Sequence, residues 1–179
     1  MQIVITGAAG FLGKKLARAI LEQEGVAIDG DYRPLERLRL VDLEAPADVG
    51  TDPRVEALGV DLTAPGALAR VVDPATDVVF HLAAVVSAAA EADFDLGMAV
   101  NLKATMDLLE TCRSLPEPPR LVFASSVAVY GGPVVAGTIT DTTHLVPQTS
   151  YGVQKAAGEL LVMDYHRKGF VDGRSLRLP

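Results

Sequence analysis

Three glycines recur at intervals of three residues near the start of the chain: Gly7, Gly10 and Gly13. They lie between a β-branched run at residues 3–5 and a helical pattern that begins at residue 11, which is the setting of a dinucleotide-binding turn. Gly7 would permit the tight turn, Gly10 would let the backbone approach a pyrophosphate, and Gly13 would allow close packing of helix on strand. A glycine-rich turn that binds nothing is the alternative, but this context favours a dinucleotide.

A carboxylate, Asp42, ends the strand-like run at residues 38–42. It could accept hydrogen bonds from the adenosine ribose hydroxyls, and its charge would repel a 2′-phosphate, so we expect NAD rather than NADP. Its distance from Gly13 exceeds the usual ~20 residues, which implies an insertion in the loop between helix and strand. Asp29 and Asp31 are rival candidates in that loop, and a solvated strand-end carboxylate is the alternative role for Asp42.

Tyr151 and Lys155 are four residues apart and would share one face of a helix. An ammonium close to a phenol favours the phenolate, so we expect Lys155 to lower the pKa of Tyr151 and make it a general acid or base for a hydroxyl group. Ser125 and Ser126 follow a predicted strand, where a serine hydroxyl could bind the same reacting oxygen. The alternatives are a chance pair on a helix surface and ordinary loop or cap serines.

Three further residues have less certain roles. Asn101 lies inside a long predicted helix, where it is either exposed or braces a loop of the site. His81 ends a predicted strand and is expected to be a packed histidine rather than a catalyst. Cys112 is expected to face the core. No cluster of His, Asp, Glu and Cys in the sequence predicts a metal site.

The elements that must position these residues alternate between strands and helices. Strands with both faces buried that are joined by helical crossovers form a parallel sheet with helices on each side, so we predict an α/β, Rossmann-type doubly wound fold. Gly25 would close the first helix. The predicted strands are residues 3–5, 38–42, 55–60, 77–81, 121–124 and 174–178, and the predicted helices are residues 11–24, 66–72, 92–113 and 150–168.

Composition limits the possible functions. The chain has 179 residues and a net charge of −7, and this negative charge argues against a surface that binds nucleic acid. Its single cysteine fits a reducing, cytoplasmic setting. The apolar run at residues 78–90 is too short to span a membrane, and the run at 121–140 is interrupted by Gly131, Gly132, Pro133 and Gly137. We therefore predict one domain over residues 1–179, with no membrane span.

Taken together, the motifs resemble the extended short-chain dehydrogenase/reductases, specifically the NAD-dependent epimerase/dehydratase family. They are TGAAGFLG at residues 6–13, Asp61-Leu62, HLAA at 81–84, Asn101, Ser125-Ser126 followed by Val129-Tyr130-Gly131, and YGVQK at 151–155. The resemblance implies that Ser126, Tyr151 and Lys155 are catalytic and that NAD is the cofactor. It implies cofactor contacts at Gly7, Gly10, Phe11, Leu12, Gly13, Asp42, Asp61, Leu62, Leu82, Ala83, Ala84, Asn101, Tyr151 and Lys155.

A narrower resemblance, in residues 81–102 and 149–179, is to family members that oxidise the C2 hydroxyl of a four-carbon sugar acid. A nucleotide-sugar epimerase or dehydratase is the alternative enzyme, and a non-catalytic NAD-binding module is the alternative outside enzymes. In either enzyme the partner is a small-molecule substrate, a sugar acid or a nucleotide sugar. Family members continue beyond the point matching Pro179 with a substrate-binding lobe, which we expect beyond residue 179. The helices at 92–113 and 150–168 match those through which the family dimerises, so a homodimer is expected.

Overall fold

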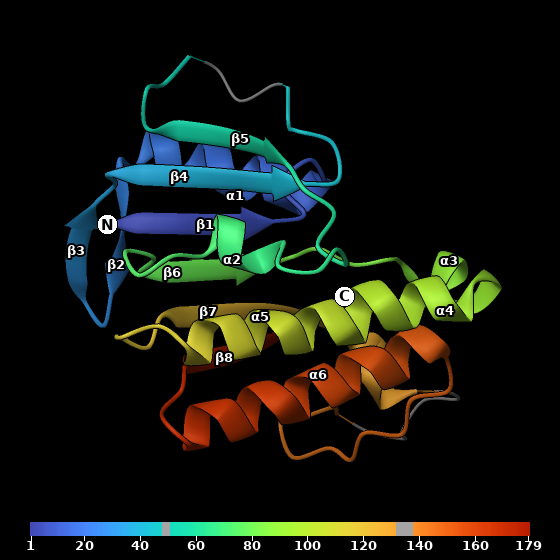
Figure 1. The fold of residues 1–179 in the computed structure, drawn as a ribbon. Coiled ribbons are helices and arrows are strands. Elements are labelled where there is room, and N and C mark those ends of the chain that lie inside the picture. Colours follow the sequence, from blue (N-terminus) through green and yellow to red (C-terminus); the bar gives the residue numbers. More distant parts are fainter. Residues whose placement is uncertain (48–50, 132–137) are drawn as a thin grey trace.

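A parallel sheet forms the centre of the computed structural model, which describes residues 1–47, 51–131 and 138–179 (Figure 1). Among these residues, the sheet has six strands in the order β5-β4-β1-β6-β7-β8, and each neighbouring pair is parallel. The chain crosses from the β1–β4 side to the β6 side, which is the strand reversal of a doubly wound fold. The predicted Rossmann-type architecture is confirmed. The strands are β1 (Gln2–Thr6), β4 (Arg37–Asp42), β5 (Val55–Gly59), β6 (Val78–His81), β7 (Arg120–Ser126) and β8 (Asp172–Leu178).

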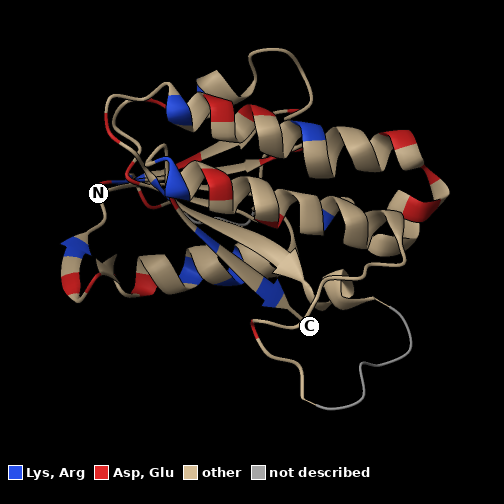
Figure 2. Ribbon diagram, turned by 90° about the horizontal axis from the view of Figure 1, so that it is seen from below, with Lys and Arg blue, Asp and Glu red and all other residues tan. Residues whose placement is uncertain are grey.

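Helices cover both faces of the sheet. The helix α1 (Phe11–Glu22) lies on one face, and α2 (Leu68–Val71), α5 (Ala104–Arg113) and α6 (Ser150–Arg167) lie on the other (Figures 1 and 2). Acidic and basic side chains are interspersed along these helices (Figure 2). Within the described residues, no helix is long and apolar enough to cross a bilayer.

The alternation of side chains along the strands builds two apolar layers. Ile3 and Ile5 of β1 join the layer that contains Ala17 and Ile20 of α1. Val4, between them, joins the opposite layer with side chains of α2, α5 and α6. Successive strand residues point to opposite faces, so one short apolar strand supplies both layers. The two layers hold the strands and helices in place, and the predicted site residues lie at the strand ends and on α1 and α6.

The first helix and the loop after it differ from the prediction. The helix α1 ends at Glu22, and Glu24 adopts the left-handed conformation with φ 56°, so the prediction that Gly25 closes the helix is wrong. Gly25 instead begins a hairpin of β2 (Gly25–Ile28) and β3 (Asp31–Pro34), where a Cβ would lie 2.2 Å from the carbonyl oxygen of Arg33. The predicted insertion is therefore this hairpin, rather than an irregular loop.

The long helix predicted at 92–113 is divided. Two short helices, α3 (Ser87–Ala92) and α4 (Phe94–Gly97), lead into a π-helical turn over Met98–Lys103 and then α5. Asp93 separates α3 from α4 because its backbone is extended and its side chain accepts a hydrogen bond from the Leu96 amide.

Two other predictions concern the segment after residue 120. The strand β7 extends to Ser126, so the serine pair lies in the strand's last residues rather than after it. Gly131 has a positive φ of 70°, whereas Gly132, Pro133 and Gly137 lie outside the described residues.

Candidate active site

A cleft of about 810 Å³ lies at the carboxyl edge of the sheet. Open α/β sheets bind ligands at this edge, at the point where the strand order reverses. The cleft brings together nearly all the residues that the sequence predicted for the site: Gly7, Gly10, Phe11, Leu12, Gly13, Asp42, Asp61, Leu62, Leu82, Ala83, Ala84, Ser126, Tyr151 and Lys155. Asn101 is the predicted residue that does not line it.

The glycine-rich turn is shaped by close backbone contacts. Gly7 has φ 72°, and a Cβ there would lie 2.6 Å from the amide nitrogen of Ala83. A Cβ on Gly13 would lie 2.4 Å from the carbonyl oxygen of Gly7. Gly10 precedes α1, and no side chain caps that helix. The first amide groups of α1 therefore lie beside the cleft without a side-chain acceptor, which is the arrangement that binds a pyrophosphate.

Two carboxylates line the same half of the cleft. Asp42 accepts hydrogen bonds from the amides of Ala9 (2.9 Å) and Leu43 (2.8 Å), so it ties the glycine-rich turn to the end of β4. Asp61 accepts hydrogen bonds from the Thr63 amide (2.9 Å) and hydroxyl (2.7 Å), and these bonds lower the pKa of Asp61. Each carboxylate oxygen can accept more than one hydrogen bond, so both groups can still bind ligand hydroxyls.

Lys155 reaches the opposite half of the cleft from the first half of α6. Its side chain is buried, with the ammonium 4.7 Å from the ring centroid of Phe123 and 5.8 Å from that of Tyr151. Among the ion pairs of the described residues, none involves Lys155. Burial without a carboxylate disfavours the charged form, and it lowers the pKa of Lys155 to about 8.

Tyr151 and Ser126 lie next to this lysine. Tyr151 is in the first turn of α6, which Thr149 begins by accepting a hydrogen bond from the Gly152 amide. Burial raises the pKa of the Tyr151 phenol, and a hydrogen bond with the Ser126 side chain acts in the opposite direction. The prediction that Lys155 lowers this pKa is therefore wrong for this structure: the lowering contribution comes from Ser126, and desolvation of the half-buried phenol outweighs it. The predicted meeting of the phenol, amine and hydroxyl does occur in the cleft.

Asn101 supports the cleft from behind. It is fully buried, accepts a hydrogen bond from the Val85 amide (2.8 Å), and donates to the Val85 carbonyl (3.0 Å) and to Oε1 of Gln154 (2.7 Å). Val85 lines the cleft, so Asn101 braces a wall of the site and joins it to α6. Of the two roles that the sequence left open, the structure supports the bracing one.

His81 occupies a buried hydrogen-bonded chain. Its Nδ1 lies 2.7 Å from the Thr6 hydroxyl, and its Nε2 lies 3.1 Å from the hydroxyl of Thr105. Burial and the charge of Lys155 lower the pKa of His81 to about 3, so it is neutral at physiological pH. The expectation of a packed histidine is confirmed.

Cys112 is also buried, as expected, and burial raises the pKa of its thiol to about 12. In the part of the chain that the structure describes, no group of three or more His, Cys, Asp and Glu residues could hold a metal ion.

Comparison with known proteins agrees with this geometry. The profile of the NAD dependent epimerase/dehydratase family matches residues 3–179. The chain belongs to this family. It is 55% identical over all 179 residues to a D-erythronate dehydrogenase of Cupriavidus necator and 46% identical to one of Haemophilus influenzae. It covers 55% and 54% of those proteins, so it spans about half the length of the curated relatives it matches.

Solved structures of epimerases and dehydrogenases share the fold. A nucleoside-diphosphate-sugar epimerase from Agrobacterium tumefaciens superposes with a TM-score of 0.90 at 43% identity, over the whole of this chain and 52% of that one. A uronate dehydrogenase mutant from the same organism, solved with NAD, has a TM-score of 0.78 at 28% identity, over 94% of this chain and 57% of its own. The family resemblance predicted from the motifs is confirmed.

Sequence reasoning named Ser125 as a candidate but missed its two partners beside this family site, Glu159 and Arg177. Ser125, Glu159 and Arg177 form a hydrogen-bonded cluster next to Ser126, in which Ser125 and Glu159 are buried and Arg177 is partly buried. Ser125 and Glu159 are 34 residues apart, and Glu159 and Arg177 are 18 apart. Opposite charges at such spacings follow no helix or strand period, so the sequence does not predict their contact. The one available signal is that Glu159 lies four residues after Lys155, on the same face of the predicted helix.

Proposed function

We propose that this chain binds NAD in the cleft and is the cofactor-binding part of a dehydrogenase that oxidises a hydroxyl group of a sugar acid such as D-erythronate. The observation that carries the proposal is the convergence of Ser126, Tyr151 and Lys155 on one side of a cleft whose other side is the glycine-rich turn. The identity of 55% with a D-erythronate dehydrogenase supports this substrate class.

The residues of the cleft fit a dinucleotide along its length. The uncapped start of α1 would bind the pyrophosphate, Asp42 would accept hydrogen bonds from the adenosine ribose, and Lys155 would bind the nicotinamide ribose. NAD, when bound, supplies the acceptor for a hydride. The negative charge of Asp42 favours NAD over NADP because it repels a 2′-phosphate.

The protein side chains would handle the proton of the substrate. Tyr151 acts as the general base for the C2 hydroxyl, and Ser126 orients the reacting oxygen with a hydrogen bond. The basic form of Tyr151 increases as the pH rises, and burial moves this increase to higher pH because it raises the pKa of the phenol. We therefore expect oxidation of the substrate to accelerate toward alkaline pH.

The test is NADH formation from NAD and D-erythronate by the product of the gene that encodes this chain. Tyr151→Phe should lower turnover by about 10²–10⁴-fold, the usual contribution of a general base, while calorimetry shows unchanged NAD binding. Tyr165→Phe is the matched control, because Tyr165 lies on the same helix and bonds Glu110 on the surface. If Tyr151→Phe kept most of the wild-type turnover, the proposed base would be wrong.

A nucleotide-sugar epimerase is the second candidate, and the structural likeness to the Agrobacterium tumefaciens epimerase favours it. Assays of UDP- and dTDP-sugars beside sugar acids separate the two enzymes. NAD binding without turnover of any of these substrates would favour a non-catalytic NAD-binding module instead.

The larger assembly is also part of the proposal. We place one NAD-binding domain in residues 1–179 and the substrate-binding lobe in the further length that the relatives possess. We propose a homodimer through α5 and α6, which lie side by side (Figure 1) and expose the apolar side chains Met106, Val153, Leu160 and Met163. A monomer in light scattering at micromolar concentration would contradict the homodimer. A cytoplasmic location stays a prediction.

A further inference from the structure

Glu159 is a buried carboxylate on α6, one helical turn after Lys155. Its side chain is 8% exposed. It accepts a hydrogen bond from the Ser125 hydroxyl, and its two oxygens accept hydrogen bonds from Arg177 at 2.8–3.1 Å. A buried carboxylate requires such partners because an isolated charge in the interior is strongly destabilising. Glu159 therefore holds the ends of β7 and β8 against α6.

Arg177 extends this cluster to the segment that follows Ser126. Its Nη1 donates a hydrogen bond to the Tyr130 hydroxyl (2.5 Å), and its guanidinium lies 4.9 Å from the centroid of the Tyr130 ring. Tyr130 ends the 3-10 turn Val127–Tyr130, which Ser126 begins as the capping residue. The cluster thus forms hydrogen bonds with the chain on both sides of Ser126, at Ser125 before it and at Tyr130 after it.

The backbone around Ser126 is less firmly held than the rest of its strand. The pairing of β7 with β6 runs from Arg120 to Phe123, whereas the pairing with β8 continues to Ser126. Beyond Phe123, a sheet neighbour therefore lies on one side, and the Glu159 cluster supplies contacts from α6. That helix also carries Tyr151 and Lys155, so the cluster links the two elements that must bring the serine hydroxyl to the phenol.

We infer that Glu159 is a positioning residue for the site: by binding Ser125 and Arg177, it sets the place of the Ser126 hydroxyl relative to the Tyr151 phenol. This role rests on the proposed function, in which those two groups act on the same substrate oxygen. The hydrogen bonds from Arg177 to Glu159 raise the pKa of the guanidinium, which agrees with the close contact of the two side chains. Catalysis by a positioned side chain requires that neighbouring residues hold it to within about half an ångström, and the hydrogen bonds of Glu159 act on the residue next to Ser126.

The test measures the Ser126–Tyr151 contact without turnover, by NMR of tyrosine labelled with ¹³C at the ζ-carbon. The Tyr151 resonance is assigned from its loss in Tyr151→Phe and followed at neutral pH. Ser126→Ala defines the shift that accompanies loss of the contact. We expect Glu159→Gln to move the resonance in the same direction by at least half as much, and the double variant to move it no further than Ser126→Ala alone.

Arg39→Met is the control, because it breaks a different guanidinium–carboxylate network of the fold. Arg39 lies on β4 and pairs with Glu56 (3.0 Å) and Asp73 (2.7 Å), and none of the three lines the cleft. We expect this variant to lose stability, measured by thermal unfolding, and to leave the Tyr151 resonance in place. If Glu159→Gln fails to fold, Ser125→Ala removes one hydroxyl while keeping the Glu159–Arg177 pair, and it should still move the resonance.

A Tyr151 resonance that stays at its wild-type position in Glu159→Gln, or in Ser125→Ala when the first variant does not fold, would overturn the inference. So would equal shifts in Glu159→Gln and Arg39→Met, or no shift in Ser126→Ala. Failure of the proposed function has a different signature, because it would show as absence of NAD binding in the wild-type calorimetry while the NMR couplings persist.

Discussion

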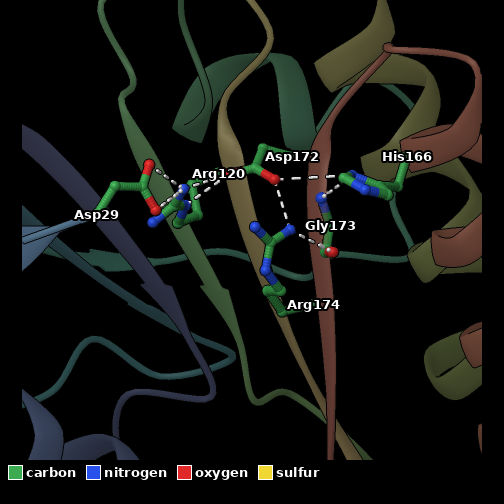
Figure 3. Close-up of polar contacts among 6 residues, drawn as sticks. All are labelled: Asp29, Arg120, His166, Asp172, Gly173 and Arg174. Atoms are coloured by element: carbon green, nitrogen blue, oxygen red, sulfur yellow. Dashed lines mark hydrogen bonds and ion pairs between the residues drawn. The ribbon is translucent and has the colours of Figure 1, made fainter.

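The amino and carboxyl ends of the strands form two edges of the sheet, and the charged groups at these edges differ in their partners. At the amino edge, Arg120 of β7 pairs with Asp29 from the β2–β3 hairpin (2.9 Å) and with Asp172 of β8 (2.5 Å). Asp172 in turn pairs with Arg174 (2.5 Å) and lies 3.6 Å from Nδ1 of His166. Figure 3 shows Asp172 between these basic groups, with the Asp29 carboxylate reaching Arg120 from the other side.

At the carboxyl edge, Glu159 and Arg177 form an ion pair beside the cleft, but two groups that line the cleft have no such partner. Lys155 is buried with aromatic rings beside its ammonium, and α1 begins with no side-chain cap. Groups without partners lower the stability of the protein when no ligand is bound, and they are available to bind a ligand. Charged groups that already pair with one another contribute to the stability of the fold instead. The comparison therefore favours the carboxyl edge as the ligand-binding one, on physical grounds that do not depend on the motifs.

The largest effect on the free energy of unfolding is expected at a glycine of the carboxyl edge, and a glycine of the amino edge that also has a positive φ is its control. Gly7→Ala should lower the free energy of unfolding by about 4 kcal/mol, because a Cβ at φ 72° would be strained and would lie within 2.9 Å of three backbone atoms of residues 82–83. Gly30→Ala, in the hairpin turn with φ 91°, has no atom within 4 Å of its Cβ and should lose about 1 kcal/mol. Denaturant unfolding measures both. Equal losses would show that the glycine-rich turn is not tightly packed.

Lys155→Met should stabilise the protein at neutral pH. The pKa of Lys155 falls from 10.5 to about 8 on folding, so the folded state disfavours the ammonium by about 3 kcal/mol below pH 8. Between pH 8 and 10.5 the unfolded chain binds the additional proton, and the wild-type free energy of unfolding therefore rises with pH across that window. The variant should lack this rise, so its advantage of up to about 3 kcal/mol at pH 7 should disappear by pH 10.5.

Denaturant unfolding of the wild type and of this variant at several pH values measures the difference. A variant that is less stable than the wild type at pH 7 would mean that Lys155 has a partner that compensates its burial. NADH formation by the variant should be lost even as its stability rises, which is the usual conflict between stability and activity.

Asp42→Asn should weaken NAD binding by about tenfold, because the amide carries no charge and accepts fewer hydrogen bonds than the carboxylate. Calorimetry measures the affinity. Asp172→Asn at the amino edge is the control, since Asp172 bonds Arg120 and Arg174 far from the cleft lining. Equal effects of the two substitutions on affinity would remove the functional distinction between the edges.

The smallest effect is expected at the amino edge. Arg120→Met should lower the free energy of unfolding by about 1 kcal/mol, because Asp29 is largely exposed and its pairing is screened by water and salt. Denaturant unfolding at low and high salt should show this loss shrinking as salt is added. A loss of several kcal/mol, independent of salt, would mean that the amino edge is held as a buried ion-pair network.

Much of this arrangement could be predicted from the sequence, because it depends on local patterns. Short β-branched runs predicted strands of the sheet, and the spacing of Gly7, Gly10 and Gly13 predicted the turn between the first strand and the first helix. The features that were missed depend on tertiary contacts. The hairpin at residues 25–34 lacks a strong apolar alternation, and Glu24 rather than a glycine adopts the positive φ before it. The pKa of Tyr151 depends on how deeply the phenol is buried, which residue spacing does not reveal.

The contact between Asp29 and Arg120 joins residues 91 positions apart. During synthesis, the hairpin leaves the ribosome long before its partner on β7, and β4, β5 and β6 must be added between them. Closing so long a segment carries a large entropic penalty until the intervening strands are in place. We therefore expect the ion pair at this corner to form after the intervening strands and to stabilise the assembled sheet rather than nucleate it.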